Sequence, residues 1–211
     1  QAFITTDLDD NQITAFHPGA MTYSHLNRVT DARDATLGIV APDGRDGMLQ
    51  HAQDLAAAGV PFVFDPGQGL PMFSGEELLG FMRLANYACF NDYEAKLLCD
   101  RTGRSLEQLA TEVQALIVTL GGAGSRILAD GRCHEIPCVQ AEAVVDPTGC
   151  GDAYRSGLLY GIAAGWDWEK VGRLAAVMGA IKIAHRGGQN HRPGRADISD
   201  LFAKAFGTNL W

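Results

Sequence analysis

Short apolar runs alternate with helix-like stretches along most of the chain, and this alternation constrains the fold more than any other feature. Between the runs, apolar residues recur at helical spacing, as at Met48, Ala52 and Leu55. Four runs have the length of buried strands, at residues 36–41, 60–64, 87–90 and 116–120. The pattern predicts an α/β fold with a mainly parallel sheet, in which sites lie beyond the carboxyl ends of the strands.

Two polar turns predict short antiparallel hairpins beside this alternation. Residues 5–7 and 12–16 flank the first turn, and residues 125–129 and 134–139 flank an Asp-Gly turn. Ser74, followed three residues later by Glu77, predicts the capped start of a helix. The last third of the chain predicts a strand followed by three helices, at 144–145, 153–164, 168–185 and the stripe from 198 to 206.

Composition restricts the function classes that this fold can serve. A net charge of −8 argues against an extended nucleic-acid surface. No apolar run approaches the roughly 18 residues of a membrane span. The cysteines are odd in number, which is typical of reduced thiols. We therefore expect a cytoplasmic protein whose partners include neither nucleic acid nor a membrane.

Cys133, His134 and Cys138 are close enough in sequence to suggest a metal cluster. No second ligand pair follows at the spacing of a zinc site, so the pattern favours a strand edge with incidental thiols.

The segment DPTGCGD, residues 146–152, carries the most chemistry. We expect it to follow a strand and open a helix, where Gly149 and Gly151 let the backbone approach a ligand closely. Backbone N–H groups and the dipole at a helix start favour an anion, such as a transferring phosphoryl group. Asp152 would then be placed to accept a proton from an attacking hydroxyl. An Asp that merely caps a helix explains the same spacing, and the spacing alone leaves both readings open.

This segment resembles the second signature of the ribokinase (PfkB) family of carbohydrate and nucleoside kinases, which reads D-T-x-G-A-G-D. Asp146, Gly149, Gly151 and Asp152 agree with it, whereas Pro-Thr follows the first Asp and Cys150 replaces the usual alanine. The resemblance implies a ribokinase-like three-layer α/β/α sandwich with a mainly parallel sheet. It also implies that Asp152 is the catalytic base and that the N–H groups of Gly149, Cys150 and Gly151 form an anion hole.

Further segments match the family in the right order. Asn91 and Glu94 resemble its N-x-x-E motif, which organises Mg²⁺ and phosphate, although a helix cap followed by an ordinary glutamate explains them equally. Thr119, Gly121 and Gly124 resemble the strand and turn that hold ATP, with a plain hairpin entry as the alternative.

The late loop at residues 186–190 lies where the family borders the nucleotide and a monovalent cation. The resemblance implies that Asp146 and Thr148 help to bind this cation, with K⁺ as the candidate.

The substrate side is suggested by four segments that look like the bacterial adenosine-kinase-like branch, at residues 5–13, 16–21, 65–68 and 152–157. Gln68 and Phe16 then become substrate-binding candidates, since an aromatic ring can stack on a base or cover a sugar. A surface turn and hairpin packing are the respective alternatives. The resemblance implies an ATP- and Mg²⁺-dependent kinase acting on a primary hydroxyl of a nucleoside or sugar, with the 5′-hydroxyl of adenosine as the best match. A sugar kinase and a non-catalytic nucleotide-binding module remain alternatives.

The sequence departs from the family at its front. Family members begin with a core strand, a sugar-gripping Asp and a Gly-Gly signature, which this sequence does not contain. We therefore expect residues 1–20 to be part of the family's β-strand lid and residues 21–211 to form the nucleotide-binding and catalytic core of a longer kinase. Because these lids often mediate dimers, a homodimer through the lid is a further expectation.

Overall fold

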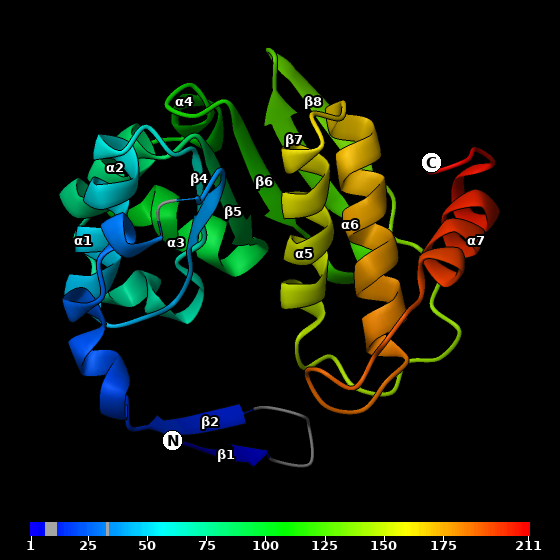
Figure 1. Ribbon diagram of the computed structural model, residues 1–211, viewed down its shortest axis with the longest axis horizontal. Helices are drawn as coiled ribbons and strands as arrows, with labels where there is room; N and C mark the ends of the chain where they lie inside the picture. The colour runs from blue at the N-terminus through cyan, green and yellow to red at the C-terminus, as the bar shows by residue number, and fades with distance from the viewer. Residues whose placement is uncertain (7–11, 33) are drawn as a thin grey trace.

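A six-stranded sheet forms the centre of the computed structural model, which describes residues 1–6, 12–32 and 34–211 (Figure 1). The strands lie in the order β3-β4-β5-β6-β7-β8, so β3 and β8 are its edges. The pairs from β3 to β6 are parallel, and the last two pairs are antiparallel. The strand bounds are Gly38–Val40, Phe62–Phe64, Tyr87–Asn91, Ala115–Thr119, Ser125–Ala129 and Arg132–Ile136. The mainly parallel sheet predicted from the sequence is confirmed.

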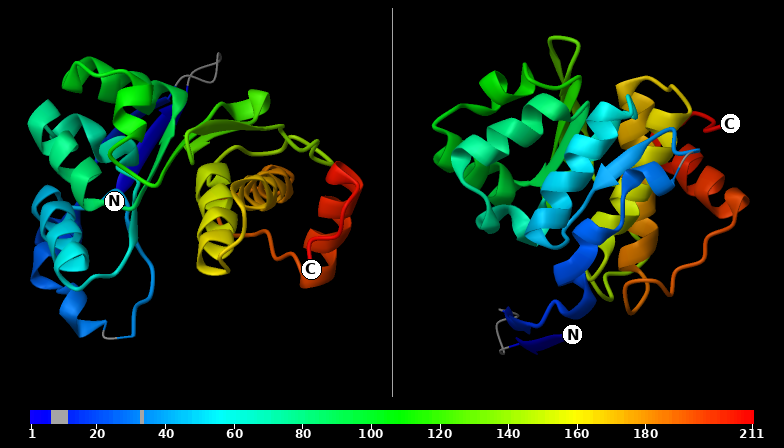
Figure 2. Two further views of the ribbon diagram at one scale, coloured as in Figure 1. Left: turned by 90° about the horizontal axis from the view of Figure 1, so that it is seen from above. Right: turned by 60° about the vertical axis from the view of Figure 1, so that its left-hand side comes forward.

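Helices cover both faces of this sheet (Figure 2). One face carries α1 to α4 and the other carries α5 and α6, while α7 packs on the outside of α6. The helix bounds are Arg45–Ala57, Gly75–Leu84, Asp92–Thr102, Leu106–Ala110, Cys150–Ala163, Trp168–Ile183 and Arg195–Phe206, from α1 to α7. The Ser74–Glu77 capping box predicted at the start of α2 is present.

The alternation of side chains along the strands produces the three layers. Successive strand residues point to opposite faces, so Phe64 and Phe90 pack among α1–α4. Their neighbours Val63 and Cys89 pack against α5 and α6. The ring of Phe64 stacks on that of Phe81 in α2, with 4.5 Å between the ring centroids. Strands that are apolar on both faces therefore require helices on both faces.

A separate antiparallel hairpin, β1 (Ala2–Thr6) with β2 (Gln12–Phe16), precedes the α/β unit. It confirms the first predicted hairpin, whose turn at residues 7–11 lies outside the described residues. The 3₁₀ helix η1 (Gly19–Leu26) follows and packs against α1. Figure 1 shows the hairpin at the end of the molecule where α5 begins.

The structure differs from the prediction just before residue 146. No strand forms at residues 144–145, and within the described chain the sheet ends at β8. The segment instead crosses the end of α6, where the N–H groups of Val145 and Asp146 both donate to the carbonyl of Ile183 at 2.9 and 3.1 Å. Val144 is consequently 81% exposed. The helix α5 begins at Cys150, earlier than predicted.

The second predicted hairpin is confirmed as β7 and β8. The edge strand β8 carries Cys133 and His134, as the strand-edge interpretation predicted, and Cys138 follows in coil. Both thiols are free and exposed. Among the described residues, no helix combines the length and the apolarity that crossing a bilayer would need.

Candidate active site

Several polar residues, most of them predicted site residues, meet at the carboxyl edge of the parallel strands. Asp65 follows β4, Asn91 ends β5 and Thr119 ends β6. Asn91 and Thr119 lie directly opposite each other in the β5–β6 register. Gln68 is exposed in the 3₁₀ helix η3 (Gly67–Met72), just beyond Asp65. The edge is therefore assembled from residues that the parallel topology brings together.

The first turn of α5 offers free donors beside an acidic side chain. Gly149 is the N-cap residue and adopts a left-handed conformation with φ +79°, which favours glycine. Asp152 lies exposed in the first turn. Within the described chain, the N–H groups of Gly151 and Asp152 have no acceptor. The N–H of Cys150 instead donates to the carbonyl of Pro147 at 3.1 Å.

Of the three donors that the resemblance implied for the anion hole, the N–H of Cys150 is engaged within the chain, and those of Gly149 and Gly151 have no acceptor among the described residues. A tight turn from Pro147 to Cys150 consumes one of the three donors that the resemblance implied. The N–H of Asp152 is a further donor without an acceptor in this first turn, among the described residues. An N-terminal turn with free N–H groups remains suited to an anion.

Two polar contacts hold α5 over the sheet edge. The guanidinium of Arg155 donates to both carboxylate oxygens of Asp65, with 2.7 Å between Nη2 and Oδ1. The hydroxyls of Tyr154 and Ser125 lie 2.8 Å apart, which links α5 to the start of β7. Burial raises the pKa of Asp65, and the charge of Asp152 adds to this effect. These contacts place Asp152, one turn before Arg155, at the carboxyl edge of the sheet.

Asn91 and Glu94 form a reciprocal capping box at the start of α3. The N–H of Glu94 donates to Asn91 Oδ1 at 2.7 Å, and the N–H of Asn91 donates to Glu94 Oε2 at 2.8 Å. The helix-cap alternative is thus present in the structure. Burial raises the pKa of Glu94, and its second carboxylate oxygen remains for a ligand.

The loops at residues 146–149 and 185–190 are bound together. Asp146 accepts the N–H of Thr148 at 2.9 Å and that of Gly187 at 2.7 Å. These backbone bonds hold the pKa of Asp146 at about 2. A Cβ on Gly149 would lie 3.0 Å from the Cα of Gly188, so the two backbones approach closely.

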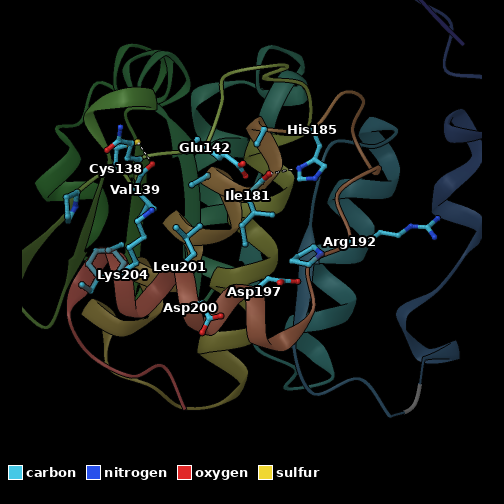
Figure 3. A pocket seen from close by; sticks show the side chains of 18 residues that line it. Cys138, Val139, Glu142, Ile181, His185, Arg192, Asp197, Asp200, Leu201 and Lys204 are labelled. Atoms are coloured by element: carbon cyan, nitrogen blue, oxygen red, sulfur yellow. Dashed lines mark hydrogen bonds between the residues drawn. The ribbon is translucent and has the colours of Figure 1, made fainter.

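A cavity of about 1120 Å³ opens between α6, α7 and the coil at residues 137–142 (Figure 3). Val139, Ile181 and Leu201 give it apolar walls, and His185 lies toward one end. Cys138 lies at the other end. A Cβ on Gly124 would lie 2.9 Å from the backbone nitrogen of Cys138, so the turn at 121–124 approaches this coil closely. The coil that lines the cavity therefore lies next to the turn at 121–124, and the cavity reaches His185 at the start of the late loop.

The structure brings most of the predicted residues to one edge but leaves Phe16 apart. Phe16 is 56% exposed on the separate hairpin. Sequence reasoning missed Asp65, Arg155 and Lys182 as parts of the site. Arg155 follows Asp152 by nearly one helical turn, and Lys182 lies between the apolar residues Ile181 and Ile183; both patterns were visible signals.

Comparison with known proteins identifies relatives of this chain. A nucleoside kinase from Methanocaldococcus jannaschii is 36% identical over 195 residues, which cover 92% of this chain and 63% of the relative. Structures of a Burkholderia thailandensis nucleoside kinase, with inosine and with ADP-inosine, are 58% identical to this chain. Their TM-scores are 0.96 and 0.95; the alignments cover 99% of this chain and 69% and 66% of theirs.

The chain thus spans less than two thirds of the length of its archaeal relative. A ribokinase from Thermotoga maritima, 20% identical, has a TM-score of 0.77 over 96% of this chain and 69% of its own, a likeness of fold alone. The ribokinase-like α/β fold is therefore confirmed. The family model described as pfkB family carbohydrate kinase matches residues 2–195. The chain belongs to this family.

Proposed function

We propose that the protein is an ATP-dependent kinase that phosphorylates the 5′-hydroxyl of a purine nucleoside. The observation that carries the proposal is the start of α5, where free N–H groups and Asp152 are held over the sheet edge by the Arg155–Asp65 pair. The relatives support the substrate class, since the Burkholderia thailandensis kinase was captured with inosine and with ADP-inosine. Adenosine is our first candidate, with inosine beside it.

The nucleotide is proposed to lie along the cavity next to α6. Its apolar walls, including Val139 and Ile181, suit a flat base. Thr119, Gly121 and Gly124 would then border the ribose and phosphates, with Asn91 facing Thr119 across the strands. The phosphates would extend from the turn at 121–124 toward the first turn of α5.

In the proposed transfer, the nucleoside hydroxyl attacks the γ-phosphorus of ATP while the bond to the β-phosphate oxygen breaks. Asp152 takes the hydroxyl proton, ADP leaves, and the phosphate ester remains on the nucleoside. The N–H groups of Gly151 and Asp152 stabilise the negative charge that develops. The N–H of Cys150 is engaged by the carbonyl of Pro147, whereas that of Gly149 has no acceptor in the described chain and would join them.

Mg²⁺ fits this edge as an ion that comes with the phosphates. In the described ranges no three metal-binding side chains form a cage, and Mg²⁺ commonly uses one or two carboxylates plus phosphate oxygens. Glu94, with one free oxygen, and Asp152 are the carboxylates that would hold it. When bound, Mg²⁺ neutralises phosphate charge.

The hairpin is proposed to cover the substrate. Phe16 would stack on the base or sugar and Gln68 would donate or accept a hydrogen bond at the sheet edge. We propose residues 1–20 as part of a lid, and a homodimer through that lid. Stacking requires Phe16 to approach the start of α5. The hairpin lies at the same end of the molecule as the start of α5 (Figure 1).

The test is ADP release from ATP with a panel of adenosine, inosine, ribose and fructose. The proposal expects release with purine nucleosides; release with ribose alone would favour a sugar kinase. Release with none of them, despite ATP binding, would favour a non-catalytic nucleotide-binding module.

Asp152→Asn tests the base directly. The variant is expected to lose roughly 10²–10⁴-fold in turnover while ATP binding is retained. Asp100→Asn, at an exposed position of α3, makes the same charge change and should leave turnover unchanged. Near-full activity of Asp152→Asn would refute the base assignment.

A further inference from the structure

Lys182 is a completely buried lysine, with 0% of its surface exposed, in the last turn of α6. Its ammonium group donates to the carbonyl of Asp146 at 2.8 Å and to that of His185 at 2.9 Å. These distances are typical of charge-assisted hydrogen bonds. A buried charge is costly unless it is compensated, so this lysine is held for a specific interaction.

The two acceptors belong to two different loops. Asp146 opens the segment that leads into α5, and His185 opens the loop at residues 185–190. The carboxylate of Asp146 also links the two loops, because it accepts the N–H of Gly187. Lys182 is therefore the centre of a clasp between the two loops. We call this set of contacts the Lys182 clasp.

The clasp lies directly before the proposed transfer site. Only three residues separate Asp146 from the start of α5 at Cys150, and Gly149 contacts Gly188 on the other loop. A displacement of either loop would therefore shift the free N–H groups of α5. A shift of about 1 Å in such a site can cost roughly 10²-fold in rate.

The same atoms do not fit the monovalent cation that the resemblance implied. The carbonyl of Asp146 already accepts from Lys182, and each carboxylate oxygen of Asp146 accepts a backbone N–H. A second positive charge here would also be repelled by the buried ammonium group. The ammonium group of Lys182 thus already places one positive charge against carbonyl oxygens, as a bound K⁺ ion would do.

We propose that Lys182 is a positioning residue that acts as a built-in cation, fixing both loops so that phosphoryl transfer needs no added monovalent cation. The catalytic part of this proposal rests on the proposed kinase function. The loop-fixing part does not, because it concerns the folded chain alone.

The first experiment compares Lys182→Met with Lys170→Met, which removes a lysine from the same helix. Lys170 lies over the ring of Trp166, 4.2 Å from its centroid, at the opposite end of α6. Hydrogen exchange at the N–H groups of Thr148 and Gly187 reports the clasp without any catalysis. Protection is expected to fall in Lys182→Met and to stay unchanged in Lys170→Met; unchanged protection in both would overturn the proposal.

The second experiment measures ADP release at constant ionic strength with choline, Na⁺ or K⁺ as the cation. Wild type is expected to be indifferent to this choice. Lys182→Met is expected to lose roughly 10²-fold in kcat with a smaller change in KM for ATP, and to regain part of it with K⁺ or methylammonium. A merely structural lysine would not create such a cation requirement.

Severalfold activation of wild type by K⁺ over choline would overturn the proposal, and so would full turnover of Lys182→Met in choline. If Lys182→Met fails to fold, Lys182→Gln is measured in the same way. If wild type turns over no nucleoside or sugar, the proposed function fails, while hydrogen exchange still decides the clasp.

Discussion

The ion pair between Arg155 and Asp65 is the contact that most directly ties the helix of the candidate site to the sheet. Replacing Arg155 with Met keeps most of the side-chain length but removes both donors to Asp65. Asp65 is 4% exposed, so water cannot readily take over these hydrogen bonds. The substitution therefore leaves a buried carboxylate without its partner.

Removing one member of a buried pair costs roughly 3–5 kcal/mol of stability. The carboxyl can reduce this cost by taking up a proton, and burial already raises the pKa of Asp65. A carboxyl whose folded pKa lies above its unfolded value destabilises the protein as the pH rises between the two values. Arg155→Met is therefore expected to lose more stability at about pH 8 than at about pH 5.

Urea unfolding followed by circular dichroism, at both pH values, measures this loss. The double variant Asp65→Asn/Arg155→Met is expected to recover much of it, because no buried charge remains. Arg126→Met is the control, since Arg126 pairs with Glu135 on the exposed surface of the β7–β8 hairpin; its cost should stay below about 1 kcal/mol. Equal losses in Arg155→Met and Arg126→Met, or a loss independent of pH, would refute the reasoning.

Two further predictions concern packing and pH. Gly157→Ala is expected to cost about 1–3 kcal/mol in urea unfolding, because its Cβ would lie 2.8 Å from the Cα of Ala175 between α5 and α6. Gly80→Ala, in α2 with open space around it, should be neutral or stabilising by about 0.5–1 kcal/mol, and equal effects would contradict the packing argument. Asp146 has a pKa of about 2, below its ordinary value, so its contribution to stability is present above about pH 4 and lost as the pH falls to 2. Acid unfolding of Asp146→Asn should therefore be less steep in this window than that of wild type, and an unchanged slope would count against the bonds to Gly187 and Thr148.

The layers of the fold were predictable because each buried strand carries its own signal. Phe62–Phe64 is apolar on both faces, and a run of this kind needs helices above and below it whatever its neighbours are. The capped helix starts at Ser74 and Asn91 were predictable for the same reason, because donor and acceptor lie within four residues.

The sequence could not predict the features that depend on contacts between residues from different elements. Val144 and Val145 look like a strand, yet the carbonyl of Ile183 accepts the N–H of Val145 from another element. The partners Asp65 and Arg155 lie 90 residues apart, and no local pattern joins them. Pro147 likewise takes the N–H of Cys150 through a turn whose geometry the motif does not specify. The motif therefore does not by itself specify which N–H groups at the start of α5 are free.

Because β3 is an edge strand, the sheet can be extended by a further strand on that side. Within the described ranges, β3 pairs with β4 alone, so one side of its backbone still presents N–H and C=O groups in a row. Such a row is a template for another strand. A strand added there, from this chain or another, would lengthen the sheet sideways while Asn91, Thr119 and the start of α5 keep their relative positions. Pairing of a further strand with β3 therefore does not require the candidate site on β5, β6 and α5 to rearrange.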